Sequence, residues 1–219
     1  MLPADGLSAA KVRAALGQCV IGREIVVVDE TTSTNDLVLQ MANGGAAEGL
    51  VVFAEHQTAG RGQRGNVWKS PAGKSLLFSI LLRPNIAVQD SARLVEWAVK
   101  GIAWTVEAMS LRKAAIRLPN DVYVDGRKIA GVLVEMRAQA DAPHLAVVGI
   151  GMNVNQTSRL FPEELRECAT SLSIVLGGPV DRIALAIALL RNLDQLYREI
   201  FATDGGALPQ SRPVILQRL

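Results

Sequence analysis

The sequence has few cysteines, few aromatic residues and almost no excess of charge. Its 219 residues include only two cysteines, Cys19 and Cys168, and 4% aromatic residues. The two cysteines lie far apart, and neither has a second cysteine or a histidine nearby in the sequence. No disulfide framework and no metal cage is therefore predicted. Both cysteines are expected to be small buried hydrophobic residues.

Charge of one sign and long apolar runs are also scarce. The chain carries 23 Lys and Arg against 21 Asp and Glu, a net charge of +2, which indicates neither a nucleic-acid nor a membrane partner. No apolar run approaches the roughly 18 residues of a membrane span, and the N-terminus lacks the apolar core of a signal peptide. We expect a cytoplasmic protein. The stretch before the first predicted strand leaves no room for a helix-turn-helix domain.

The remaining composition predicts one folded domain with helices and strands mixed along the chain. Hydrophobic residues make up 49% and charged residues 20%, enough apolar material for a sizeable core. Because Asp125-Gly126 between two strand-like runs predicts a hairpin, the sheet cannot be wholly parallel. The fold class is therefore α+β, a mixed sheet flanked by helices, over residues 1–204, followed by a tail at 205–219. Strands are predicted at 24–29, 50–54, 75–82, 115–118, 122–124, 128–136 and 145–154. Helices are predicted at 7–16, in a short segment that follows residues 31–36 and ends near 43, from a cap at Asp90 or Ser91 to about 109, and, capped by Asp181, at 182–201.

A long glycine-rich loop follows the second predicted strand. Residues 60–65, GRGQRG, match the dinucleotide-binding pattern, but the chain continues as loop into a strand and opens no helix to receive pyrophosphate. Residues 73–75 resemble the end of a P-loop, but the glycine required five positions earlier is Trp68. The glycines with Arg61 and Arg64 instead suit a loop that closes around a carboxylate or phosphate.

Four other segments carry groups that orient a polar ligand. These are residues 33–35 (STN), 119–121 (PND), 128–133 (KIAGVL) and 149–153 (GIGMN). Each alone is typical of a cap, a turn or a bulge. Their occurrence together with the arginine loop predicts a binding site.

The motifs TTSTN, AEHQTAGRGQRGNVWKSPAGKSLLFSILL, LPNDVYVDGRKIAGVLVE and GIGMNVN occur in the order found in biotin protein ligases. The sequence resembles this family from about Ile25 to Phe201. The resemblance implies a fold similar to class II aminoacyl-tRNA synthetase cores. It also implies a two-step reaction, in which biotin and MgATP give biotinyl-5′-AMP and pyrophosphate, and biotin then passes to a lysine of a biotin carboxyl carrier protein, a subunit of acetyl-CoA carboxylase.

The resemblance also implies roles for individual residues. Arg61 and Lys128 would neutralise the biotin carboxylate and the phosphates, and Asp121 would accept or orient the proton of the incoming lysine. No protein metal ligand is expected, and Mg2+ would enter with ATP. The expected biotin-binding residues are Ser33, Thr34, Asn35, Gln57, Gly60, Arg61, Gly62, Gln63, Trp68, Lys128, Gly131 and Leu133. The expected nucleotide-binding residues are Arg61, Arg64, Arg117, Asn120, Lys128, Gly149, Gly151 and Asn153.

Three departures from the family pattern leave alternatives open. Gln63 stands where many relatives have a second arginine, and Arg117-Leu118 replaces the usual Lys-Trp. The chain ends where a small C-terminal β-barrel would begin in relatives. The alternatives are a lipoate-type ligase and a non-catalytic biotin-binding module. The resemblance also allows a homodimer, since edge-strand dimers occur in related enzymes.

Overall fold

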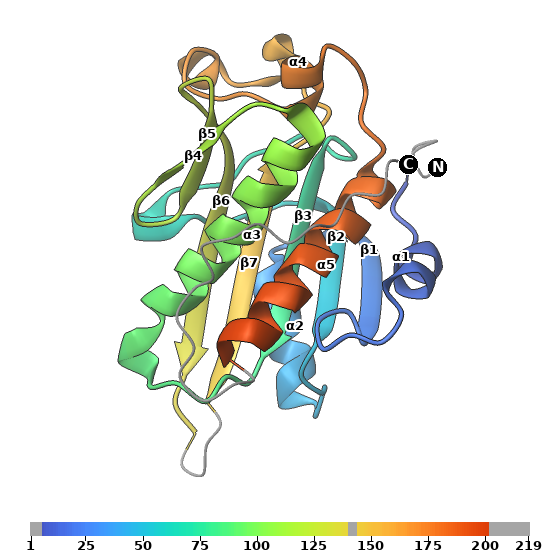
Figure 1. Cartoon of the computed structure of the whole chain (residues 1–219), viewed down its shortest axis with the longest axis vertical. Coiled ribbons are helices and arrows are strands. Elements are labelled where there is room, and N and C mark those ends of the chain that lie inside the picture. Colours follow the sequence, from blue (N-terminus) through green and yellow to red (C-terminus); the bar gives the residue numbers. More distant parts are fainter. Residues whose placement is uncertain (1–5, 140–143, 202–219) are drawn as a thin grey trace.

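A seven-stranded sheet runs through the centre of the computed structural model, which describes residues 6–139 and 144–201 (Figure 1). The strand order is β1-β2-β3-β7-β6-β5-β4. Only β1 and β2 are parallel, and every other neighbouring pair is antiparallel, so the predicted mixed sheet is confirmed. The strands are β1 (Glu24–Thr31), β2 (Leu50–Gln57), β3 (Ser75–Leu82), β4 (Ala114–Arg117), β5 (Asp121–Val124), β6 (Arg127–Arg137) and β7 (Leu145–Asn153).

Helices cover both faces of this sheet. In Figure 1, α3 and α5 cross in front of the sheet and α2 lies behind it. The larger core lies between the sheet and the α3–α5 pair, where Trp97 is fully buried and donates from Nε1 to the carbonyl of Leu193 at 3.1 Å. The helices are α1 (Ala9–Leu16), α2 (Thr34–Asn43), α3 (Ala92–Ser110), α4 (Leu172–Leu176) and α5 (Arg182–Phe201), with short 3₁₀ turns η1 (Gln63–Gly65), η2 (Val88–Asp90), η3 (Ser158–Leu160) and η4 (Glu163–Leu165).

Local sequence signals account for several of the observed boundaries. Asp181 Oδ1 accepts from the backbone N–H of Ile183 and of Ala184, at 2.8 and 3.1 Å, and so caps α5 as predicted. Asp125 and Gly126 have φ of 48° and 78°, the left-handed conformations of the predicted tight hairpin turn. Ser91 stands at the start of α3, but its side chain makes no capping hydrogen bond, and Asp90 lies in η2.

Two expectations need correction, one lies outside the described residues, and one observed helix was not expected. The second strand continues past Ala54 to Gln57, because residues up to Gln57 pair with β1. Helix α4 was not predicted, since five residues are too few for a periodic pattern. Cys168 is exposed and Cys19 half-buried, so the expected full burial is wrong. The predicted tail at 205–219 lies outside the described residues.

A buried ion pair links β2 to the start of α5, and its carboxylate also binds the segment before α1. Arg182, at the start of α5, is fully buried, and its Nη1 lies 2.6 Å from Oε2 of Glu55 on β2. Glu55 Oε1 also accepts from the backbone N–H of Leu7 at 2.7 Å. The segment before α1 is therefore fixed to β2 and α5 through one carboxylate.

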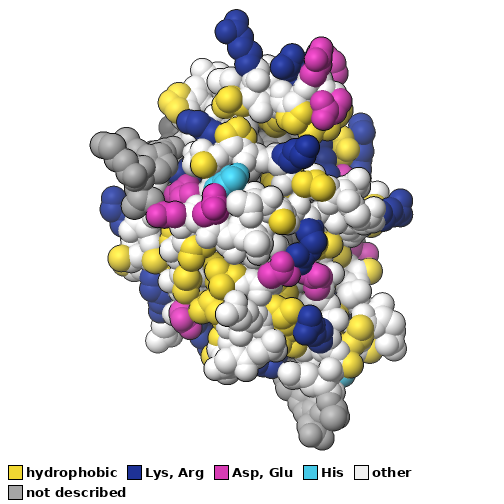
Figure 2. All heavy atoms as spheres, turned by 180° about the vertical axis from the view of Figure 1, so that it is seen from behind, with side chains coloured by type: hydrophobic (Ala, Val, Ile, Leu, Met, Phe, Trp, Pro, Cys, Tyr) yellow, Lys and Arg dark blue, Asp and Glu magenta, His cyan; other side chains and the backbone are white. Residues whose placement is uncertain are grey.

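Surface charge is mixed on the face opposite α3 and α5. Figure 2 shows lysine, arginine and acidic side chains interspersed there with hydrophobic ones, without a large area of one sign. Among the described residues, no helix has the length and apolar character needed to cross a membrane.

Candidate active site

The floor of a pocket lies on the face of the sheet that α2 covers, where glycines on neighbouring strands leave the backbone without side chains. The strand register places Ser79 on β3 opposite Gly149 on β7, and Gly149 opposite Leu133 on β6. Two residues further along, Gly151 on β7 pairs with Gly131 on β6. Because alternate residues of a strand face the same side, these glycines leave a side-chain-free area in the middle of that face.

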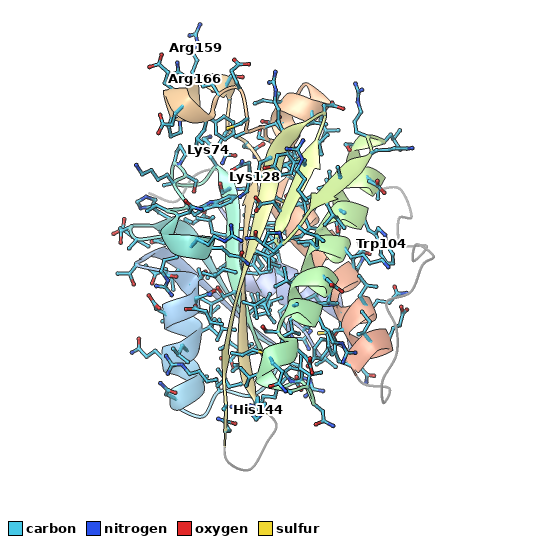
Figure 3. The ribbon with its side chains drawn as sticks, turned by 90° about the vertical axis from the view of Figure 1, so that its left-hand side faces the viewer. Lys74, Trp104, Lys128, His144, Arg159 and Arg166 are labelled. Carbon is cyan, nitrogen blue, oxygen red and sulfur yellow. The ribbon has the colours of Figure 1, made fainter. Side chains whose placement is uncertain are left out.

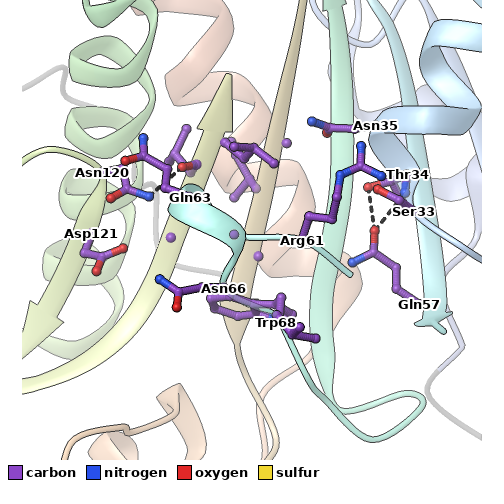
Figure 4. A pocket seen from close by; sticks show the side chains of 18 of the residues that line it. Ser33, Thr34, Asn35, Gln57, Arg61, Gln63, Asn66, Trp68, Asn120 and Asp121 are labelled. Atoms are coloured by element: carbon purple, nitrogen blue, oxygen red, sulfur yellow. Dashed lines mark hydrogen bonds between the residues drawn. The ribbon is translucent and has the colours of Figure 1, made fainter. Parts of the chain in front are cut away.

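Segments far apart in the sequence surround this floor (Figure 4). The remaining space is about 120 Å3, because the indole of Trp68 lies over the floor. Most of the predicted site residues line it: Ser33, Thr34, Asn35, Gln57, Arg61, Gly62, Gln63, Trp68, Asn120, Asp121, Lys128, Gly131, Leu133, Gly149 and Gly151. Asn66, Val67, Val132 and Ile150 line it as well and were not predicted.

Amide and hydroxyl groups gather at the end of the pocket near the N-terminus of α2. Gln57 Oε1 accepts from both the backbone N–H and the hydroxyl of Thr34, at 2.7 and 3.0 Å. Asn35 Oδ1 accepts from the hydroxyl of Ser79 at 2.6 Å. Thr34, Asn35 and Ser79 are all buried, so these polar groups hold one another in fixed orientations.

Gly149 is required for this arrangement because Asn35 approaches its backbone closely. A Cβ atom at position 149 would lie 2.2 Å from Asn35 Oδ1 and 3.0 Å from its Cγ. Any side chain there would displace the amide that faces the pocket. Close packing against Asn35 thus explains why the first glycine of the GIGMN segment is a glycine, whether or not it also contacts a ligand.

The glycine-rich loop folds back on itself above the floor. Gly62 N donates to the carbonyl of Asn66 at 2.7 Å, and Trp68 N donates to the carbonyl of Gly60 at 2.9 Å. Arg61 and Val67 form an isolated antiparallel bridge between these bonds. The loop is therefore a small hairpin that carries Arg61 and Trp68 at its base.

Arg61 is held at the pocket by two acidic side chains. Its guanidinium makes two hydrogen bonds to Asp36, at 2.6 and 2.7 Å, and one to Glu135 Oε2 at 3.3 Å. The hydrogen bond from Arg61 lowers the pKa of Asp36, against the effect of partial burial. The same bond raises the pKa of Arg61, so the guanidinium stays charged at any working pH.

Lys128 forms the second cationic contact of the pocket, from the start of β6. Its Nζ lies 2.7 Å from Oδ1 of Asp121 and 5.8 Å from the ring centre of Trp68. Its backbone N–H donates to the carbonyl of Cys168 at 2.7 Å, which fixes the strand end beside η4. Figure 3 shows Lys128 and Lys74 near one end of the sheet and His144 at the opposite end. Arg61 and Lys128 line the same pocket, although they come from separate segments of the chain.

Four predicted residues lie outside the lining of the pocket. Gly60 supports the hairpin through its carbonyl, and Arg64 is exposed at the hairpin tip with φ of 57°. Arg117 stacks on Tyr123, with its guanidinium carbon 4.1 Å from the ring centre. Asn153 is buried and donates to the carbonyl of Thr170 at 3.0 Å. Their contribution to nucleotide or biotin binding stays a prediction.

Three functional candidates were missed by sequence reasoning: Ser79, Asp36 and Glu135. Ser79 had a signal, because it is the only polar residue inside the otherwise apolar run of β3, LLFSILL. Asp36 and Glu135 had none, since an acidic residue on a helix or strand end is usually solvated. Within the described part of the chain, no group of three or more His, Cys, Asp or Glu side chains could hold a metal ion.

Comparisons with known proteins identify the family. The profile described as "Biotin/lipoate A/B protein ligase family" matches residues 27–153, more than half of the chain. The chain belongs to this family. The bifunctional ligase/repressor BirA of Bacillus subtilis is 36% identical over 199 residues, which cover 91% of this chain and 61% of that protein. The biotin--[acetyl-CoA-carboxylase] ligase of Mycobacterium tuberculosis is 36% identical over 177 residues, 78% of this chain and 63% of that ligase. The chain thus spans about three-fifths of these relatives.

Solved structures of family members share the fold. The biotin protein ligase from Aquifex aeolicus in complex with biotin and ATP matches with a TM-score of 0.69 and 28% identity, over 82% of this chain and 72% of that one. The Leishmania major biotin protein ligase in complex with biotinyl-5-AMP matches with a TM-score of 0.61 and 26% identity, over 81% and 76%. The predicted fold, a mixed sheet of the biotin protein ligase and class II synthetase type, is confirmed.

Proposed function

We propose that this chain activates biotin with MgATP as biotinyl-5′-AMP and transfers the biotinyl group to a lysine of a biotin carboxyl carrier protein. One observation carries the proposal: the guanidinium of Arg61 and the ammonium of Lys128 line the same pocket as the amide and hydroxyl cluster around Thr34. The family relatives whose names include biotin support the choice of substrate.

The cluster at the α2 end suits the ureido ring of biotin. That ring has two N–H donors and one carbonyl acceptor, all of which need partners when buried. Ser33 and Thr34 supply hydroxyls, while Asn35 and Gln57 supply amides. The orientations of Thr34, Asn35 and Gln57 are fixed by hydrogen bonds among them and with Ser79. A preorganised polar cluster loses little entropy when the ligand binds.

The two cations supply the catalytic effect of the first step. A carboxylate oxygen of biotin attacks the α-phosphorus of ATP, the bond from that phosphorus to the bridging oxygen breaks, and Mg-pyrophosphate leaves. Both reactants are anions, so their approach is opposed by charge. Arg61 and Lys128 reduce that repulsion and stabilise the charge on the phosphoryl oxygens in the transition state. Mg2+ enters as part of the substrate MgATP.

The hairpin protects the product of this step. Biotinyl-5′-AMP is a mixed anhydride that water hydrolyses, so the site must be shielded until the acceptor arrives. The indole of Trp68 lies over the floor, and its Nε1–H is buried without a hydrogen-bond partner among the described residues. That N–H is a donor for a carboxylate or phosphate oxygen.

Asp121 is the proposed proton acceptor of the second step. The lysine amine of the carrier attacks the acyl carbon, AMP leaves, and the proton lost from the amine passes to a base. Asp121 Oδ1 lies in the pocket, 2.7 Å from Lys128 Nζ, which keeps the carboxylate near the reacting atoms. A homodimer and a cytoplasmic location remain predictions, as does the division into a catalytic part at 1–204 and a tail.

A coupled assay tests the proposal. The protein is mixed with biotin, MgATP and inorganic pyrophosphatase, and phosphate release is followed in the presence and absence of biotin. Biotin-dependent release is the expected result. A carrier domain is then added, and its biotinylation is read by a streptavidin blot.

The alternatives give different outcomes in the same experiments. Calorimetric titration with lipoate and with biotin separates the two ligases: tight binding of lipoate alone would overturn the choice of substrate. Biotin binding without phosphate release above the blank would indicate a non-catalytic binding module.

A further inference from the structure

The indole of Trp68 rests on two glycines that face each other across neighbouring strands. A Cβ atom at Gly151 would lie 2.7 Å from Cε2, 2.9 Å from Cδ2 and 3.0 Å from Cζ2 of Trp68. A Cβ atom at Gly131 would lie 3.2 Å from Asp121 Oδ1, 3.3 Å from Cζ3 of the same indole and 3.4 Å from Lys128 Cε. The ring therefore occupies the space that a side chain at position 151 would fill, and it shares the space at position 131 with Asp121 and Lys128.

Backbone conformation does not explain these glycines. Neither Gly131 nor Gly151 has a positive φ, and both lie inside regular ladder pairs. Glycine in a strand interior destabilises the strand, because it contributes no side chain to packing and loses more backbone entropy on folding. Close approach of the indole is the reason that the structure offers for Gly151, and at Gly131 the indole is one of three close side chains.

The position of the indole is linked to the conformation of the whole hairpin. Trp68 N bonds to the carbonyl of Gly60, and the neighbouring Val67 is bridged to Arg61. The ring centre also lies 5.8 Å from Lys128 Nζ. The indole is thus a contact between the backbone of the hairpin and the floor of the pocket.

We propose that Gly151 and Gly131 are positioning residues that form the seat of Trp68 and thereby hold the hairpin closed over the pocket. The inference rests on the proposed function, in which the closed hairpin retains the adenylate. Neither glycine needs to contact the substrate for this role. A side chain at position 151 would push the indole away from the floor, favour the open hairpin and let the adenylate escape.

Limited proteolysis of the full chain tests the seat without any substrate. Arg64 and Lys69 are exposed on the hairpin, so trypsin cleaves there when the hairpin opens. We expect Gly151→Ala to accelerate cleavage at these sites about tenfold, since overpacking at such a contact is strongly unfavourable. Gly178→Ala is the matched control, because nothing lies within 4 Å of its added Cβ, and its cleavage rate should equal that of the parent chain.

A double variant distinguishes a seat for the indole from a general weakening of the sheet. Trp68→Ala removes the ring, so Gly151→Ala should have no further effect on cleavage in that background. An equal acceleration in both backgrounds, or none in the parent chain, would overturn the proposal. If Gly151→Ala fails to give a cooperative thermal transition, Gly131→Ala replaces it in the proteolysis experiment alone, because its indole contact is milder at 3.3 Å but its Cβ would also meet Asp121 Oδ1 at 3.2 Å.

The coupled assay then separates this inference from the proposed function. In Gly151→Ala, we expect a larger fraction of the biotinyl-5′-AMP that forms to appear in solution than in the parent chain, whatever the rate of its formation. Faster cleavage combined with no biotin-dependent release in the parent chain would refute the proposed function and leave the seat intact. Unchanged cleavage with normal biotin-dependent release would refute the seat alone.

Discussion

Arg61 and Asp36 form an ion pair with two hydrogen bonds, of 2.6 and 2.7 Å, between the glycine-rich hairpin and the first turn of α2. The pair places the loop cation next to the polar cluster that begins at Ser33. Both side chains are more than a third exposed, at 39% and 48%, so the contact orients the guanidinium more than it stabilises the fold.

Removal of the carboxylate should therefore change catalysis more than stability. We expect Asp36→Asn to lower the rate of adenylate formation by about two- to fivefold, because the Arg61 guanidinium loses one of its two acidic partners. An exposed ion pair of this kind contributes about 1 kcal/mol or less. Asp29→Asn, at an exposed residue of β1, is the control and should leave the rate unchanged. A rate in Asp36→Asn equal to that of the parent chain would show that Glu135 alone orients Arg61.

The lowered pKa of Asp36 predicts a pH dependence with a definite sign. Because Arg61 favours the ionised carboxylate in the folded chain, its stabilising contribution is present above the ordinary Asp pKa of about 3.9 and is lost as the pH falls through the lowered value. The difference in urea midpoint between the parent chain and Asp36→Asn should be the same at pH 6 and pH 8 and shrink below about pH 4. A difference that grew on acidification would contradict this.

Lys128 should matter for chemistry far more than for folding. Lys128→Ala is expected to reduce the rate of adenylate formation by about 100- to 1000-fold, as for the loss of one donor to a developing oxyanion. Lys113→Ala, outside the pocket lining, should leave the rate unchanged. Pre-steady-state measurement of pyrophosphate release distinguishes this from slow product release. An unaltered first turnover would remove Lys128 from the mechanism.

Ser79 should affect biotin binding although its side chain lies beneath the cluster. Ser79→Ala removes the donor to Asn35 Oδ1, a net loss of about 1 kcal/mol, or roughly fivefold in biotin Kd. Ser79→Thr keeps the hydroxyl and should restore part of the affinity. Calorimetric titration with biotin measures both variants, and an unchanged Kd in Ser79→Ala would show that Asn35 needs no support.

The buried pair of Arg182 and Glu55 should dominate the stability of the fold. Arg182→Met leaves the Glu55 carboxylate buried without its cation, and the expected loss is about 3–5 kcal/mol in the free energy of unfolding. Chemical denaturation at pH 7 measures it. Arg159→Met, on exposed η3, is the matched control with an expected change below about 0.5 kcal/mol. Equal denaturation midpoints for the two variants would contradict the role of the Arg182–Glu55 pair in stability.

Much of the fold could be predicted because local chemistry decides it. Strand β3 matches its prediction at both ends, and the Asp125-Gly126 turn has no good alternative to a tight hairpin. The end of β2 was misjudged because Glu55 and Gln57 are polar, and a polar residue usually marks the end of a buried strand. Their partners, Arg182 and Thr34, are 127 and 23 residues away, so no local pattern reveals them.

The site was predictable in its residues but not in their contacts. Family motifs indicated Arg61, Lys128 and the polar cluster, and the structure brings them to one pocket. The acidic partners of Arg61 depend on strand register and on the position of α2, which the sequence specifies only through the complete fold. The glycines of β6 and β7 could be noticed, but the ring that lies on them could not.

The exposed thiol of Cys168 provides an attachment point for a reporter beside the pocket. The carbonyl of Cys168 accepts from Lys128 N, so a dye attached to this residue would be carried by a segment bonded to the strand that bears Lys128, while the Cys168 side chain is absent from the pocket lining. Burial and Asp194 raise the pKa of Cys19, which leaves that thiol less reactive. Maleimide labelling should thus select Cys168, and a single-dye chain could follow hairpin movement in real time.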